Sequence, residues 1–87
     1  MNLDQAVLRQ IRKVRQVLAA PEFSDTARQL EEIGFIPNEQ VTVLARGFPG
    51  GDPLVVRVGL SSFALRRHEA QMILLHEVDM HEVEPHE

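Results

Sequence analysis

Three histidines recur at five-residue intervals near the end of the sequence, and a glutamate follows each of them. They are His76, His81 and His86. Imidazole and carboxylate groups together suit iron or zinc, so these histidines are candidate ligands for a divalent metal. No regular helix or strand aligns side chains at that interval, so a mononuclear site needs a folded loop or a second chain. The alternative is a solvated acidic tail that picks up metal adventitiously.

Nothing else in the sequence combines residue types in a catalytic pattern. His68 lies among charged residues with no nucleophile beside it, which favours a surface histidine. The chain has no cysteine, which excludes disulfides, thiolate metal sites and a thiol nucleophile. Gly47, Gly50 and Gly51 stand among prolines with no Gly-Lys-Ser/Thr after them, so no phosphate-binding loop is present. The sequence predicts a protein that is not an enzyme.

The formal net charge of −4 is unevenly distributed along the 87 residues. Residues 76–87 contain five acidic residues and no lysine or arginine, which leaves nine basic and eight acidic residues in 1–75. A chain of this length has room for one core. We therefore expect a nearly neutral domain over 1–75, followed by an acidic tail rich in histidine and glutamate over 76–87.

Four basic residues lie close together near the N-terminus: Arg9, Arg12, Lys13 and Arg15. They could attract an acidic protein surface or a lipid leaflet. Alternatively they form the solvent face of an edge element, where such charges oppose aggregation. Nucleic acid is not an expected partner, because all four aromatic residues are phenylalanine and none lies in this run.

The distribution of apolar residues also predicts a cytoplasmic location. No uninterrupted apolar run exceeds four residues, whereas about 20 are needed to span a bilayer. The N-terminal residues include too many charges for the apolar stretch of a signal peptide.

Hydrophobic periodicity predicts one clear helix and leaves one segment ambiguous. Residues 7–18 place apolar side chains at helical spacing, but most of these side chains are β-branched and suit a strand. After a proline, a helix capped by Ser24 or Asp25 should carry Leu30 on its apolar face. Gly34 should end this helix in a Schellman motif.

Two-residue alternation predicts strands in the second half of the chain. In residues 40–48, Val41, Val43 and Ala45 should face the core, with Leu44 outside as an exception. The remaining elements are expected in this order: a turn at 48–53, a strand at 54–58, a turn at 59–62, a strand at 63–65, a short helical turn at 66–71 and a strand at 72–75. Such a series is typical of a small barrel or sandwich.

Four short blocks of residues stand in a fixed order between Leu30 and Leu75. They are Leu30-x-x-Ile33-Gly34-x-x-Pro37, Val41-x-Val43, Gly51-Asp52-Pro53 and Ala64-Leu65-Arg66-x-x-Glu69-Ala70-x-x-Ile73. In this combination they resemble the FeoA family. The resemblance implies a mainly β fold, a small SH3-like β-barrel with one helix between the first two strands and a short helical turn before the last. The resemblance also implies that residues 6–17 form the first strand. For the ambiguous residues 7–18 we therefore predict a strand rather than a helix. Asn38 replaces a glycine that is common in the family, and asparagine tolerates the left-handed conformation.

The same resemblance implies an accessory protein of bacterial ferrous iron uptake that binds the cytoplasmic region of the FeoB transporter and supports or regulates it. The chain would then reach the membrane only through the transporter. Leu44, Phe48 and Arg66 are the expected partner-binding residues. Arg66 could be offered to the partner's nucleotide, or it could anchor the last turn to Glu69 or Asp52, which is the favoured interpretation.

Two other functions remain open at this stage. A barrel of this kind also occurs as the accessory domain of iron-dependent regulators, although the sequence offers no helix-turn-helix segment to accompany it. The chain could instead bind a divalent metal, iron or zinc, through the histidines of its tail.

Overall fold

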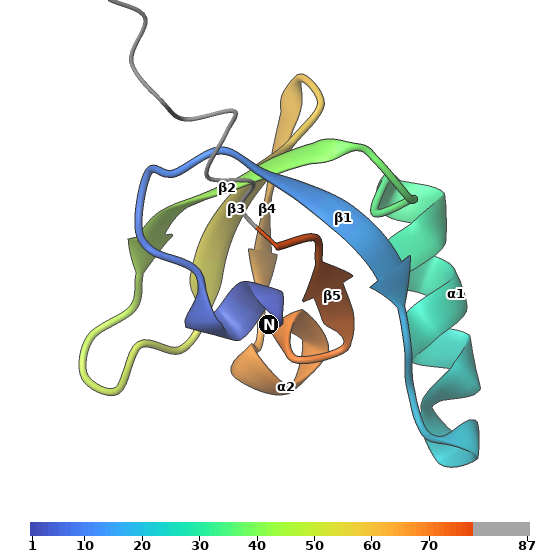
Figure 1. Ribbon diagram of the computed structural model, residues 1–87. Coiled ribbons are helices and arrows are strands. Elements are labelled where there is room, and N and C mark those ends of the chain that lie inside the picture. The colour runs from blue at the N-terminus through green and yellow to red at the C-terminus, as the bar shows by residue number, and fades with distance from the viewer. Residues whose placement is uncertain (78–87) are drawn as a thin grey trace, which may run out of the picture.

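A computed structural model describes residues 1–77 of the chain (Figure 1). The elements follow in the order η1 (Leu3–Gln5), β1 (Arg12–Val17), η2 (Pro21–Phe23), α1 (Ser24–Ile33), β2 (Gln40–Arg46), β3 (Leu54–Val58), β4 (Ser61–Leu65), α2 (Arg67–Ala70) and β5 (Ile73–Leu75). The five strands form one antiparallel sheet in the order β4-β3-β2-β1-β5. The expected mainly β fold is confirmed, with one helix between the first two strands and a short turn of helix before the last.

The core lies on one face of the curved sheet, because apolar side chains alternate along the strands. Leu54, Val56 and Val58 of β3 are buried, while the residues between them are exposed. Helix α1 lies beside β1 (Figure 1) and contributes Leu30 to the core. The chain turns inward after the helix, where Phe35 is fully buried. The core therefore joins the sheet to the segment that ends α1.

Residues 7–18 form no helix, and the first strand is shorter than expected. It covers Arg12–Val17 rather than 6–17. Of the apolar residues at helical spacing, only Val14 is buried, while Val7 and Ile11 are each more than 60 % exposed. The N-terminal residues instead form η1, whose Leu3 is fully buried against the rest of the core. The segment forms a strand rather than a helix because β1 pairs with both β2 and β5.

The expectation that Ala45 faces the core is wrong. Val43 is paired with Val56, but Ala45 is paired with Val55, so β2 carries one extra residue at Leu44. This bulge shifts the side-chain alternation, because an inserted residue reverses which face the next ones occupy. Ala45 is consequently exposed and Leu44 is half-buried on the outer face.

The end of helix α1 is as predicted, and its start is not. Neither Ser24 nor Asp25 caps the helix, since it continues from the 3-10 turn η2 with no side-chain hydrogen bond at its first residue. At the other end Gly34 has a φ of 135°, and the Phe35 N–H donates to the Leu30 carbonyl at 3.0 Å. Of the two hydrogen bonds that define a Schellman motif, this is the one that spans more residues. Asn38 has a φ of 73°, as expected for a residue in a glycine position.

No helix within residues 1–77 is long and apolar enough to cross a bilayer.

Candidate functional site

The loop between β2 and β3 presents the most exposed aromatic side chain of the described residues. Phe48 is 97 % exposed, although phenylalanine usually lies inside. The loop is closely packed at its base, where the Gly47 N–H donates to the Pro53 carbonyl at 2.8 Å. A Cβ added to Gly47 would lie 2.6 Å from the Asp52 carbonyl oxygen, so only glycine fits there. The phenyl ring therefore extends into solvent from a well-defined backbone.

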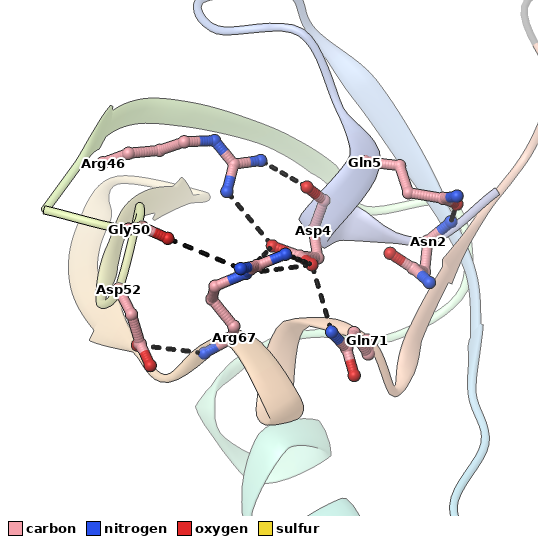
Figure 2. A network of polar contacts seen from close by, with 8 residues as sticks. All are labelled: Asn2, Asp4, Gln5, Arg46, Gly50, Asp52, Arg67 and Gln71. Carbon is pink, nitrogen blue, oxygen red and sulfur yellow. Dashed lines mark hydrogen bonds and ion pairs between the residues drawn. The ribbon is translucent and has the colours of Figure 1, made fainter.

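A polar network joins this loop to the N-terminal turn η1 and to α2 (Figure 2). Its centre is the Asp4 carboxylate, whose side chain is only 6 % exposed. Arg46 of β2 donates to Asp4 Oδ1 at 3.1 Å and also to the Asp4 backbone carbonyl. Arg67 of α2 donates from Nε to Oδ1 and from NH2 to Oδ2, both at 3.1 Å, and Gln71 Nε2 donates to Oδ2 at 3.1 Å. One carboxylate thus connects η1, β2 and α2.

The network has a marked electrostatic effect on Asp4. Hydrogen bonds from Arg67 above all, and then from Gln71 and Arg46, lower the pKa of Asp4 from 3.8 to about 2, although burial acts in the opposite direction. The same contact raises the pKa of Arg67. A carboxylate with this set of donors stays ionised throughout the physiological range, so its role is structural rather than acid-base.

Asp52 fixes the tip of the loop to the start of α2. Its Oδ1 accepts the Arg67 backbone N–H at 3.2 Å and lies 3.8 Å from Arg66 NH1. The Arg67 side chain also donates to the Gly50 carbonyl at 3.4 Å. These contacts bring Phe48 and Arg66 to the same end of the molecule. We refer to Phe48–Pro53 together with Arg66 as the loop end.

Arg66 itself is available for further contacts. Its side chain is 64 % exposed and its ion pair with Asp52 is long, so that pair stabilises the fold little. The Arg66 backbone N–H is held by Glu69 Oε1 at 2.8 Å. The expected anchoring to Asp52 and Glu69 is therefore present, mainly through the backbone of the helix start.

Leu44 does not lie with the other two expected partner-binding residues. It lies on the outer face of the sheet, as expected, in a groove of about 490 Å³. Its lining includes Arg9 and Ile11, which precede β1, and the paired residues Thr42 of β2 and Arg57 of β3. We refer to this feature as the outer groove. The structure brings Phe48 and Arg66 together but assigns Leu44 to a separate surface.

The basic run is divided between the interior and the surface. Arg12 is only 6 % exposed, and its NH2 donates to the His76 carbonyl at 2.8 Å. Lys13 and Arg15 are exposed on β1. Since β1 lies between β2 and β5, the interpretation of the run as the face of an edge element is wrong. Arg12 acts as an internal hydrogen-bond donor that holds the end of β5.

The candidate metal ligands lie largely beyond what the structure describes. His76 is exposed just after β5, whereas His81 and His86 lie outside the described residues. Within residues 1–77, no three histidine, aspartate or glutamate side chains are grouped as a metal site. His68 is exposed on α2, as expected for a surface histidine.

Sequence reasoning missed the residues that organise the loop end. They come from three distant parts of the chain, namely Asp4, Arg46, and Arg67 with Gln71, and Arg67 follows Asp4 by 63 positions. Each is an ordinary surface residue type, and none occurs in a motif. The only signal in the sequence was the glycine- and proline-rich segment 48–53. It predicted a turn but not the distant residues that hold this turn.

The fold and these surfaces define a small SH3-like barrel with exposed contact surfaces and, in residues 1–77, no cluster of metal-ligating side chains. The FeoA domain family matches residues 1–77, and the chain belongs to this family. Among solved structures, FeoA of Stenotrophomonas maltophilia complexed with zinc is 37 % identical, with a TM-score of 0.80 over 87 % of this chain and 89 % of that one. FeoA of Chlorobium tepidum is 30 % identical, with a TM-score of 0.73 over 100 % of this chain and 79 % of that one. No curated protein sequence matches the chain.

Proposed function

We propose that this chain is a cytoplasmic, non-catalytic accessory protein of ferrous iron uptake that binds the cytoplasmic region of FeoB and supports or regulates the transporter. The observation that carries the proposal is the match of the whole described chain to the FeoA family. The Stenotrophomonas relative is described as a candidate ferrous iron transport activating factor with an SH3 fold. An iron-dependent regulator is less well supported, because α1 is the only helix longer than four residues within 1–77.

The loop end is the surface that best suits this contact. Aromatic and arginine side chains dominate the binding energy of protein interfaces, and Phe48 and Arg66 offer one of each. Full burial of a phenylalanine contributes about 2–3 kcal/mol. Because the Asp4 network fixes the loop on two sides, little conformational entropy is lost when a partner binds.

The test is capture of FeoB from a membrane extract by the immobilised chain. We expect Phe48→Ser to reduce capture by about tenfold, which corresponds to about 1.4 kcal/mol. Leu60→Ser is the matched control, because Leu60 is equally exposed but lies at the β3–β4 turn. No capture by the folded wild-type chain would remove the proposal. Equal losses for the two variants would remove the loop end as its surface.

Arg66 is proposed as a binding residue rather than a group that acts on the transporter's nucleotide. Arg66→Ala should weaken FeoB capture and leave GTP hydrolysis at saturating concentrations of the chain unchanged. An arginine that stabilises a phosphoryl-transfer transition state is worth about 10³-fold or more in rate, so the two roles are easily separated.

A second function is suggested by the zinc complex of the Stenotrophomonas relative. We propose that the histidines of the tail bind divalent iron or zinc. His76 supplies one imidazole at the exposed end of β5, and His81 and His86 would supply the others. Calorimetric titration with each metal tests this function.

A further inference from the structure

The outer groove combines two cations with apolar side chains. Its lining includes Arg9 and Arg57 together with the apolar side chains of Ile11 and Leu44. Ile11 is 63 % exposed, which is unusual for an isoleucine. Glu39 is the one acidic residue in the lining. The groove therefore suits an acidic segment that also carries apolar side chains.

The two arginines are not neutralised by the rest of the domain. Within residues 1–77 all three ion pairs involve Arg46, Arg66 or Arg67, and neither Arg9 nor Arg57 takes part. Their side chains also make no hydrogen bonds to other described residues, unlike the arginines of the Asp4 network. Carboxylates placed in the groove would gain two partners that are already at the surface and need little desolvation.

The last described residues lie across β1 from the strands that line this groove. The His76 N–H donates to the Lys13 carbonyl at 3.0 Å, and Arg12 NH2 donates to the His76 carbonyl. Lys13 is paired with Gln40, which lines the groove, and Ile11 directly precedes Arg12. Glu77 therefore lies about one strand away from the groove, on the β5 side of β1.

The composition of residues 78–87 complements the groove. Four of these ten residues are acidic, and none is lysine or arginine. Val78, Met80 and Val83 supply apolar side chains between them. Ten extended residues reach about 33 Å, so the length is ample to cross the groove. Because the segment is tethered, its effective concentration is in the millimolar range and even weak contacts suffice.

We propose that residues 78–87 of this chain bind along the outer groove, with carboxylates beside Arg9 and Arg57. The bound segment covers Leu44, so a partner that contacts Leu44 must first displace it. The binding depends on charge and weakens as salt rises. This inference is independent of the loop end, which lies on another surface, so failure of either proposal leaves the other standing.

The absence of cysteine allows a direct test in the full chain. Pro85→Cys keeps every acidic residue and carries a single nitroxide label. We expect the label to remove most of the amide NMR signal of Thr42, Leu44 and Arg57 at low salt, while Phe48 and Arg66 keep theirs. The double variant R9E/R57E should restore the groove signals. R28E is the matched control, because Arg28 is an exposed arginine of α1, and it should leave the broadening unchanged.

Three outcomes would overturn the proposal. The first is no selective broadening of the groove amides at low salt. The second is broadening that persists in a folded R9E/R57E variant. The third comes from an equal mixture of isotope-labelled wild-type chain, which has no cysteine, and Pro85→Cys chain that carries the nitroxide but no isotope label. Broadening of the groove amides of the wild-type chain in this mixture would show that the segment binds a second copy.

Discussion

Arg67 and Asp4 form a two-point ion pair, with Nε to Oδ1 and NH2 to Oδ2 both at 3.1 Å (Figure 2). This parallel arrangement gives the contact geometric specificity, because both donors of the guanidinium face both oxygens of the carboxylate. It joins the first turn of the chain to the short helix before the last strand. The same Arg67 holds Gly50 and Asp52 of the loop, so the pair links the N-terminus to the surface that we propose for partner binding.

Asp4→Asn should lower the free energy of unfolding by about 1–2 kcal/mol, since both arginines retain some access to water. Chemical denaturation of the two proteins at neutral pH measures this difference. Asp52→Asn is the matched control, because Asp52 is more exposed and its ion pair is 3.8 Å long. An effect of Asp52→Asn as large as that of Asp4→Asn would contradict the central role of Asp4.

The contribution of Asp4 to stability should be lost in acid. Its folded pKa of about 2 lies below the ordinary 3.8, so the folded state binds fewer protons and Asp4 stabilises it above about pH 4. This stabilisation falls as the pH drops from about 4 to 2. Thermal melting across this interval should show the wild type and Asp4→Asn converging. A constant difference in stability down to pH 2 would contradict the lowered pKa.

Gly47→Ala should destabilise the loop end by about 2 kcal/mol or more, because its Cβ meets backbone atoms of Asp52 at 2.6 and 2.8 Å. Gly50→Ala separates this clash from backbone strain. Gly50 has a φ of 88° but open space around it, so only about 1 kcal/mol is expected. Denaturation midpoints measure both changes, and equal values would contradict the close approach.

Metal binding by the tail should depend on all three histidines together. Calorimetric titration of zinc or ferrous iron into H76A/H81A/H86A should show a loss of about tenfold or more in affinity relative to the wild type. Substitution is preferable to shortening the chain after Leu75, because the His76 carbonyl is bound to Arg12. His68→Ala is the control for a lone surface imidazole. Equal affinities in all three proteins would show adventitious binding.

The strands and the helix could be predicted because their signals are local. Alternation along β3 and the glycine that ends α1 depend on neighbours within a few residues. Two differences between the expected and the observed strands have a tertiary cause. The first strand begins only at Arg12, where its pairing with β2 starts, and the burial of Ala45 was reversed by a bulge at Leu44.

The candidate surfaces were only partly foreseen for the same reason. Phe48 could be identified from its place in a turn, and the structure confirms its exposure. Leu44 was expected to bind the same partner, but the structure places it in a separate groove on the outer face. Asp4 and Arg67 carried no signal at all, because a hydrogen bond between distant residues leaves no periodicity in either segment.

The sequence by itself determined the fold class, the family resemblance and the uneven charge, which is nearly neutral over residues 1–75 and acidic over 76–87. These properties depend only on residue order and composition, which are the same whether or not the chain is folded. Only the tertiary structure decided that Arg12 is an internal donor, that Asp4 organises the loop end, and that Arg9 and Arg57 line one groove without an ion pair to any residue of 1–77. Such relations depend on which distant segments the sheet places together, and strand pairing fixes them only once the whole sheet has formed.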